Sequence, residues 1–163
     1  MEEKVTFTSA GLKLAGVIHT PADMKKGERR PAILVLHGFG SNKASGNCTG
    51  PAKMLSDWGY VTLRFDMRGC GDSDRPAAEP DYANYTMAQH AADMRAALDG
   101  LGIDRCHLAT HSTGGIIAAH MQLADPDRYG RCLALDPVTP MGLKFDETSI
   151  AVFRAMQASK EVT

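Results

Sequence analysis

Three short motifs contain residue types suited to nucleophilic catalysis, and each directly follows a run of apolar residues. The motif HGFG at 37–40 follows the run at 32–36, DMRGCGDS at 66–73 follows 61–65, and THSTGG at 110–115 follows 106–109. A serine that is followed by two glycines at the end of a strand suits attack on a carbonyl carbon. The third motif therefore predicts an acyl-transfer nucleophile at Ser112.

Ser112 is expected to lie on a tight turn between a strand and a helix, where strained backbone angles project its hydroxyl beyond the sheet. The N-terminus of the following helix would favour developing negative charge nearby. Gly114 is expected where strand and helix pass too closely for a side chain. The competing interpretation is that Ser112 merely caps this helix, since serine is a common helix cap.

The glycines of the 37–40 motif favour an oxyanion hole in the same crevice. Backbone N–H groups of Phe39 and Thr113 are predicted to hold the negative oxygen of an acyl-transfer intermediate. His37 is predicted to order this loop through hydrogen bonds, with Gly38 supporting it. A phosphate-binding loop is the alternative, but neither GxxxxGK[S/T] nor GxGxxG after the first buried strand is present.

A serine nucleophile needs a histidine base and an acid that orients the histidine. The one histidine after Ser112 is His120, which lies eight residues further on in the same predicted helix, about 12 Å away. His111 is expected to point away from Ser112 and to line the turn. Asp136 directly follows the strand predicted at 131–135 and is the candidate acid; the alternative is a turn residue.

Alternating strands and helices would position these motifs. Strands are predicted at 32–36, 61–65, 106–109 and 131–135, helices at 51–58, 86–101, 114–124 and 147–159, and an antiparallel hairpin at 5–9 and 12–19. This order predicts an α/β fold with a mostly parallel sheet and helices on both faces. Ligands are expected beyond the carboxyl ends of the strands, where all three motifs lie.

The order of the three motifs resembles the α/β-hydrolase superfamily over about residues 5–135. The resemblance implies a serine hydrolase similar to esterases and lipases, because Ser112 stands where the dehalogenases have aspartate. The chain departs from the family at Thr110, where glycine is usual. In some lipases the acid is at a position similar to that of Asp136.

Complete members of the family continue with a cap, two strands and a loop bearing the histidine. The resemblance therefore implies that residues 1–136 are the N-terminal part of the core and that 137–163 begin the cap. The chain would then be truncated at the start of the cap, and the catalytic histidine would lie outside it. The strand at 131–135 would form a free sheet edge, through which self-association is expected.

Composition limits the choice of partner. Eighteen basic and 19 acidic residues give a net charge of −1, which argues against nucleic acid. No secretory signal or membrane-length apolar run is seen, so the expectation is a cytoplasmic protein. The four cysteines have no metal-binding or disulfide spacing, and no metal or cofactor is predicted.

Two functions from different classes follow from these observations. The first is a serine hydrolase that acts on a small carboxylic ester through an acyl-enzyme. The second is a truncated, non-catalytic homologue that binds a small ligand or a protein partner. The nucleophile motif favours the first, and the missing base favours the second.

Overall fold

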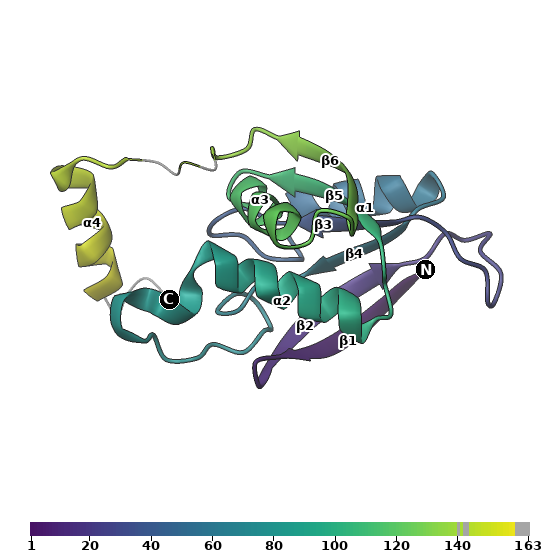
Figure 1. The fold of residues 1–163 in the computed structure, drawn as a ribbon, viewed down its shortest axis with the longest axis horizontal. Helices are drawn as coiled ribbons and strands as arrows, with labels where there is room; N and C mark the ends of the chain where they lie inside the picture. Colours follow the sequence, from purple (N-terminus) through teal and green to yellow (C-terminus); the bar gives the residue numbers. More distant parts are fainter. Residues whose placement is uncertain (140, 142–143, 159–163) are drawn as a thin grey trace.

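The chain forms a six-stranded, mostly parallel sheet with helices on both faces (Figure 1). The structure is a computed structural model that describes residues 1–139, 141 and 144–158. The strand order is β1-β2-β4-β3-β5-β6. The strands are β1 (Glu2–Ser9), β2 (Leu12–His19), β3 (Ala32–Leu36), β4 (Val61–Phe65), β5 (Cys106–His111) and β6 (Tyr129–Leu135).

The predicted hairpin at one edge is confirmed. β1 pairs antiparallel with β2 along its whole length, and β2 pairs antiparallel with β4. Ala10 and Gly11 form the two-residue turn with φ of 47° and 80°, the left-handed conformation that suits the twist of such hairpins. β3, β4, β5 and β6 are mutually parallel. The carboxyl ends of these four strands therefore meet at one edge.

Helices cover the two faces of the sheet according to the alternation of strand side chains. Leu34 and Leu36 belong to the large core with α2 (Met87–Gly100) and α3 (Gly114–Ala124). Ile33 and Val35 point the other way and form a smaller core with α1 (Gly46–Asp57). Because both faces are covered, β3 reads as a continuous apolar run.

Most predicted element boundaries agree with the structure. β3, β4 and α3 match, and Thr86 caps α2 by accepting a hydrogen bond from the Gln89 N–H. α1 begins five residues before the predicted Pro51, which lies inside the helix. The glycines around that start had favoured a loop. A 3₁₀ helix at Pro80–Tyr85 was not predicted.

The segment after β6 continues to α4 (Glu147–Ala158), which stands apart from the sheet in Figure 1. The helix was predicted to end at residue 159, which lies outside the described residues. None of the helices at 1–139 and 144–158 is both long and apolar enough to cross a bilayer.

β6 is an edge strand of the sheet, and two of its large apolar residues are half-exposed. The exposed fractions are 56% for Leu133 and 51% for Leu135. Self-association through this edge stays a prediction. We expect Leu133→Lys to shift the protein toward monomer in sedimentation velocity, since an edge charge opposes strand pairing, while Leu123→Lys on α3 does not. Equal sedimentation of the parent protein and both variants would contradict this.

Candidate active site

Ser112 lies in the turn between β5 and α3, with φ of 53°. Its N–H donates to the Leu135 carbonyl at 3.2 Å, and its carbonyl accepts from the N–H groups of Gly115 at 3.0 Å and Val138 at 3.1 Å. These bonds hold a non-glycine residue in the left-handed region. Thr113, not Ser112, is the N-cap residue of α3, and its side chain makes no capping hydrogen bond.

Two glycines allow the close approach of the segments around Ser112. A Cβ on Gly114 would lie 3.1 Å from the Leu36 Cβ, and a Cβ on Gly38 would lie 3.1 Å from the Ser112 Cβ. The predicted reason for glycine at 114 therefore agrees with the structure. The 37–40 loop is in direct contact with the serine turn.

The two N–H groups predicted to form an oxyanion hole are free to bind a ligand. Neither the Phe39 N–H nor the Thr113 N–H has a hydrogen-bond partner among the residues that the structure describes. The Phe39 side chain is 86% exposed, so the residue contributes little packing. Both residues line the same cavity. This arrangement is suited to stabilising negative charge on a bound oxygen.

His37 orders the loop that carries Phe39. The His37 ring is buried, with Nδ1 2.8 Å from the Gly38 carbonyl oxygen and Nε2 3.3 Å from the Met67 N–H. This assigns the proton to Nδ1, so that Nδ1–H donates and Nε2 accepts. His37 thereby links the loop after β3 to the loop after β4.

Burial lowers the pKa of His37 below its usual 6.5, although the Gly38 carbonyl and Asp66 oppose this shift. At pH values between the lowered pKa of folded His37 and the usual 6.5 of the unfolded chain, the unfolded chain binds more protons. The contribution of His37 to stability is therefore complete above pH 6.5 and falls as the pH decreases below that value. We expect the free energy of unfolding to be lower at pH 5.5 than at pH 7.5.

Urea denaturation at the two pH values, about 5.5 and 7.5, tests this expectation. His37→Gln should reduce the dependence on pH, whereas His120→Gln, on the half-buried face of α3, should retain it. His19 and His90 also have pKa values lowered chiefly by burial, so part of the dependence should remain in His37→Gln. An identical pH dependence in His37→Gln and the parent would contradict the assignment.

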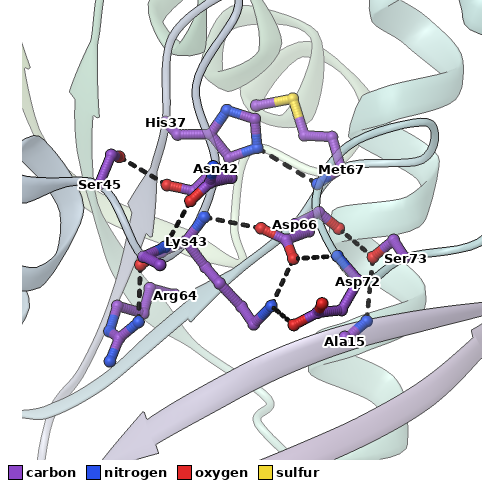
Figure 2. A network of polar contacts seen from close by, with 11 residues as sticks. Ala15, His37, Asn42, Lys43, Ser45, Arg64, Asp66, Met67, Asp72 and Ser73 are labelled. Atoms are coloured by element: carbon purple, nitrogen blue, oxygen red, sulfur yellow. Dashed lines mark hydrogen bonds and ion pairs between the residues drawn. The ribbon is translucent and has the colours of Figure 1, made fainter. Parts of the chain in front are cut away.

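A polar network centred on Asp66 fixes the two loops beneath the site (Figure 2). The buried Asp66 carboxylate accepts from the Lys43 N–H at 2.7 Å, the Asp72 N–H at 2.8 Å and the Lys43 ammonium. The Ser73 hydroxyl donates to the Asp66 carbonyl at 2.7 Å, and the Arg64 guanidinium donates to the Lys43 carbonyl at 2.6 Å. These groups are occupied by one another and hold the loops in place.

Arg68 and Asp93 form a second buried pair. The guanidinium donates two hydrogen bonds to the carboxylate at 2.7 and 2.6 Å, and a third to the Asn84 carbonyl at 2.8 Å. The Asp93 carboxylate also accepts from the Ser9 hydroxyl at 2.6 Å. The pair therefore ties the loop after β4 to α2 and β1. This agrees with the prediction that Asp66 and Arg68 pin their loop.

No base is hydrogen-bonded to the Ser112 hydroxyl among the described residues. His19 accepts from Arg64 and His107 accepts from the Arg131 N–H, while His120 lies within α3. The His111 ring has a buried Nδ1 without a hydrogen-bond partner in the described part of the chain. None of these histidines is placed to act as the base for Ser112 in the described residues.

Asp136 lies beside the serine turn. It follows Leu135, whose carbonyl accepts from the Ser112 N–H, and precedes Pro137, whose Cβ would be 2.6 Å from a Cβ on Gly115. Asp136 is exposed and has a φ of 45°. A short polar residue with positive φ is typical of a turn, so this geometry favours the turn interpretation over that of a catalytic acid.

A cavity of about 580 Å³ opens next to these groups. His37, Phe39 and Thr113 line it on the side of the serine turn, and Tyr85 and Met87 line it near the start of α2. The volume is within the range of small-molecule sites. Among the described residues, no cluster of three or more His, Cys, Asp or Glu side chains could hold a metal ion.

Sequence reasoning missed Lys43, Asp93 and the cavity residue His90. Asp93 and His90 interrupt the apolar stripe of α2, which is the signal that could have identified them. Lys43 had no such signal, because its partners Asp66 and Asp72 are 23 and 29 residues away.

The chain is similar to known proteins over most of its length. A family model described as alpha/beta hydrolase fold matches residues 31–161. A fluoroacetate dehalogenase from Burkholderia sp is 36% identical over 125 residues, 77% of this chain and 40% of that protein. Epoxide hydrolase 3 from Siraitia grosvenorii is 39% identical over 98 residues, 60% of this chain and 29% of that protein.

Solved structures give the same fold. The epoxide hydrolase CorEH superposes with a TM-score of 0.72 at 20% identity, covering 96% of this chain and 50% of the other. Epoxide hydrolase VrEH1 from Vigna radiata has a TM-score of 0.71 at 25% identity, covering 95% and 46%. The chain spans about half the length of these structures and less than half of the two curated relatives. The relatives are hydrolases, and their names do not specify the serine esterase type expected from the sequence.

Proposed function

Because the chain belongs to the α/β-hydrolase fold family, we propose that Ser112 is the nucleophile of a hydrolase acting on a small carboxylic ester through an acyl-enzyme. The observation that carries this proposal is the contact between the Ser112 turn and the 37–40 loop, with unpartnered N–H groups at Phe39 and Thr113. Attack on an ester carbonyl develops an oxyanion that two such donors would stabilise.

The residue type at 112 is the reason for proposing an ester rather than a halide. A serine hydroxyl is neutral and weakly nucleophilic without a base. Its most favourable target is a carbonyl carbon, where the charge passes to an oxygen that the two N–H groups can bind. Displacement of halide from saturated carbon produces no such oxyanion. The names of the relatives therefore support hydrolysis in general, and the chemistry of Ser112 supports the ester.

In the proposed step, the Ser112 Oγ forms a bond to the acyl carbon while its proton passes to a base. The bond from the acyl carbon to the alcohol oxygen breaks, and this oxygen takes the proton from the base as the alcohol leaves. Water then attacks the acyl-enzyme, releases the carboxylic acid and restores the serine hydroxyl. The described residues hold no base at the Ser112 hydroxyl, so the whole enzyme would need a histidine from elsewhere. Asp136 is the candidate acid of this proposal, with the turn interpretation as its alternative. No metal or organic cofactor takes part in the proposal.

A second function is favoured by the absence of a base among the described residues. A homologue without catalytic activity could bind a small ligand in the cavity beside Thr113 while its serine stays unreacted. Acylation by an activated ester separates the two functions, since an activated leaving group lowers the requirement for a base.

Incubation with p-nitrophenyl acetate tests the proposal. We expect release of nitrophenolate and an acetyl group on Ser112, detected by mass spectrometry of the digested protein. Ser112→Ala should carry no acetyl group at this peptide, whereas Ser149→Ala, in α4, should be acetylated as the parent is. A folded parent protein without acetylation at Ser112 would favour the binding function.

A further inference from the structure

The wall of the 580 Å³ cavity is mainly apolar, but it includes Arg75 and His90, whose side chains make no hydrogen bond or ion pair with the described residues. Met67, Tyr85 and Ile117 contribute to the apolar part. Arg75 lies on the loop after β4, and His90 lies in the first half of α2. Unsatisfied polar groups in an apolar pocket are the groups that fix a ligand's orientation.

Arg75 is exposed and lines the cavity, so its positive charge is available to a ligand that enters from solvent. It makes no hydrogen bond or ion pair with any residue that the structure describes. None of the described residues lining the cavity is acidic, and the other cation, Arg68, is bound by Asp93. The carboxylate of the neighbouring Asp74 accepts from the Lys13 N–H at 2.6 Å.

The charge of Arg75 reaches the cavity wall. Burial raises the pKa of the Cys70 thiol, and Asp66 raises it further, while Arg75 opposes both by favouring the thiolate. Cys70 lines the same cavity. A guanidinium here is well placed to bind an anionic group, because carboxylates match its planar array of donors.

His90 and Asp93 are the buried polar residues of α2, and the His90 ring lies 6.5 Å from the Tyr85 ring, centroid to centroid. His90 is only 8% exposed, and its Nδ1 is buried without a hydrogen-bond partner in the described residues. Its neighbours on the helix include Ala91, Met94 and Leu98, all in the core. Burial lowers the pKa of His90, which favours the neutral imidazole. Such a group destabilises the fold unless something binds it.

We propose that this cavity takes the acyl part of an ester that carries its own carboxylate. Arg75 binds that carboxylate, and the His90 imidazole forms a hydrogen bond to the bound ligand. Monoesters of dicarboxylic acids are the chemical class that fits. The inference rests on the proposed function in one respect, namely that the acyl group lies beside the Phe39 and Thr113 N–H groups.

Ligand binding to the Ser112→Ala variant tests the proposal without turnover. Monomethyl glutarate carries one free carboxylate, and in dimethyl glutarate a second methyl ester replaces this negative charge. In NMR titrations at low salt, we expect the monomethyl ester to bind about 10-fold more tightly, since a charge-assisted hydrogen bond contributes at least this factor. Adding Arg75→Gln should remove the preference, while adding Arg105→Gln, at an exposed site outside the cavity, should retain it.

His90→Leu provides an independent measurement. Replacing an unpartnered buried imidazole with an apolar side chain should raise the melting temperature by about 2–4 °C. In the Ser112→Ala background, the same substitution should weaken binding of both esters. A variant with a higher melting temperature and weaker ligand binding would show that the His90 side chain contributes to ligand binding and not to stability.

Several results would overturn the inference. These are equal binding of the two esters, no binding of either ester, a preference that survives Arg75→Gln, or full binding after His90→Leu. Each is measured with Ser112 absent, so each is independent of whether the parent protein is acylated. Acetylation of Ser112 by p-nitrophenyl acetate decides the proposed function separately.

Discussion

Replacing Phe39 with proline is expected to slow acylation of Ser112 by about 10²–10³-fold, the usual effect of losing one oxyanion donor. Proline removes the N–H that has no partner among the described residues and that we assign to the oxyanion hole. The preceding Gly38 tolerates the restriction that proline places on the residue before it. The rate of nitrophenolate release from p-nitrophenyl acetate is the measurement.

Phe39→Ala is the matched control. It removes the side chain and keeps the N–H, and the Phe39 side chain is 86% exposed. The alanine variant should therefore be acylated at nearly the parent rate. Urea denaturation of both variants would show whether the fold is retained. Equal rates for a folded Phe39→Pro variant and Phe39→Ala would exclude the Phe39 N–H from the site.

Replacing Asp93 with alanine is expected to reduce the free energy of unfolding by about 3–5 kcal/mol, because it leaves a buried charge without its partner. Asp93 is fully buried and Arg68 nearly so, and two hydrogen bonds join them. The substitution also removes the acceptor of the Ser9 hydroxyl. Urea denaturation monitored by circular dichroism measures the loss.

Asp99→Ala supplies the comparison on the same helix. Asp99 pairs with Arg128 at 2.7 Å, but its side chain is 63% exposed. An exposed carboxylate of this kind contributes about 0–1 kcal/mol. Replacing both buried partners, as in Arg68→Met with Asp93→Leu, should restore most of the stability lost in Asp93→Ala. A loss below about 1 kcal/mol for Asp93→Ala would contradict the role of the pair.

The sequence was sufficient to predict the sheet and the strand ends that carry the motifs. Buried parallel strands such as β3 are short apolar runs bounded by polar loops. Their first and last residues can therefore be recognised in the sequence. The end of α3 and the cap at Thr86 were predicted for similar local reasons. The predicted start of α1 was wrong because proline is common in the first turn of a helix and glycine is unfavourable inside one. Packing of Cys48 and Ala52 against β3 stabilises the earlier start.

The polar pairs of the site could not be predicted in the same way. Arg68 and Asp93 are 25 residues apart, and only the packing of α2 against β1 and the following loops brings them together. The cavity has the same origin, since Arg75 and His90 come from different elements. Residue types indicated where Ser112 would lie, whereas the partners of buried charges depend on the tertiary structure.

The most direct test of the central claim is reaction of the folded parent protein with a fluorophosphonate, followed by peptide mass spectrometry. We expect a phosphonyl group on Ser112, with none on that peptide in Ser112→Ala and slower labelling in Phe39→Pro. Labelling at another serine, or no labelling of protein shown to be folded by circular dichroism, would contradict the assignment of Ser112 as the nucleophile.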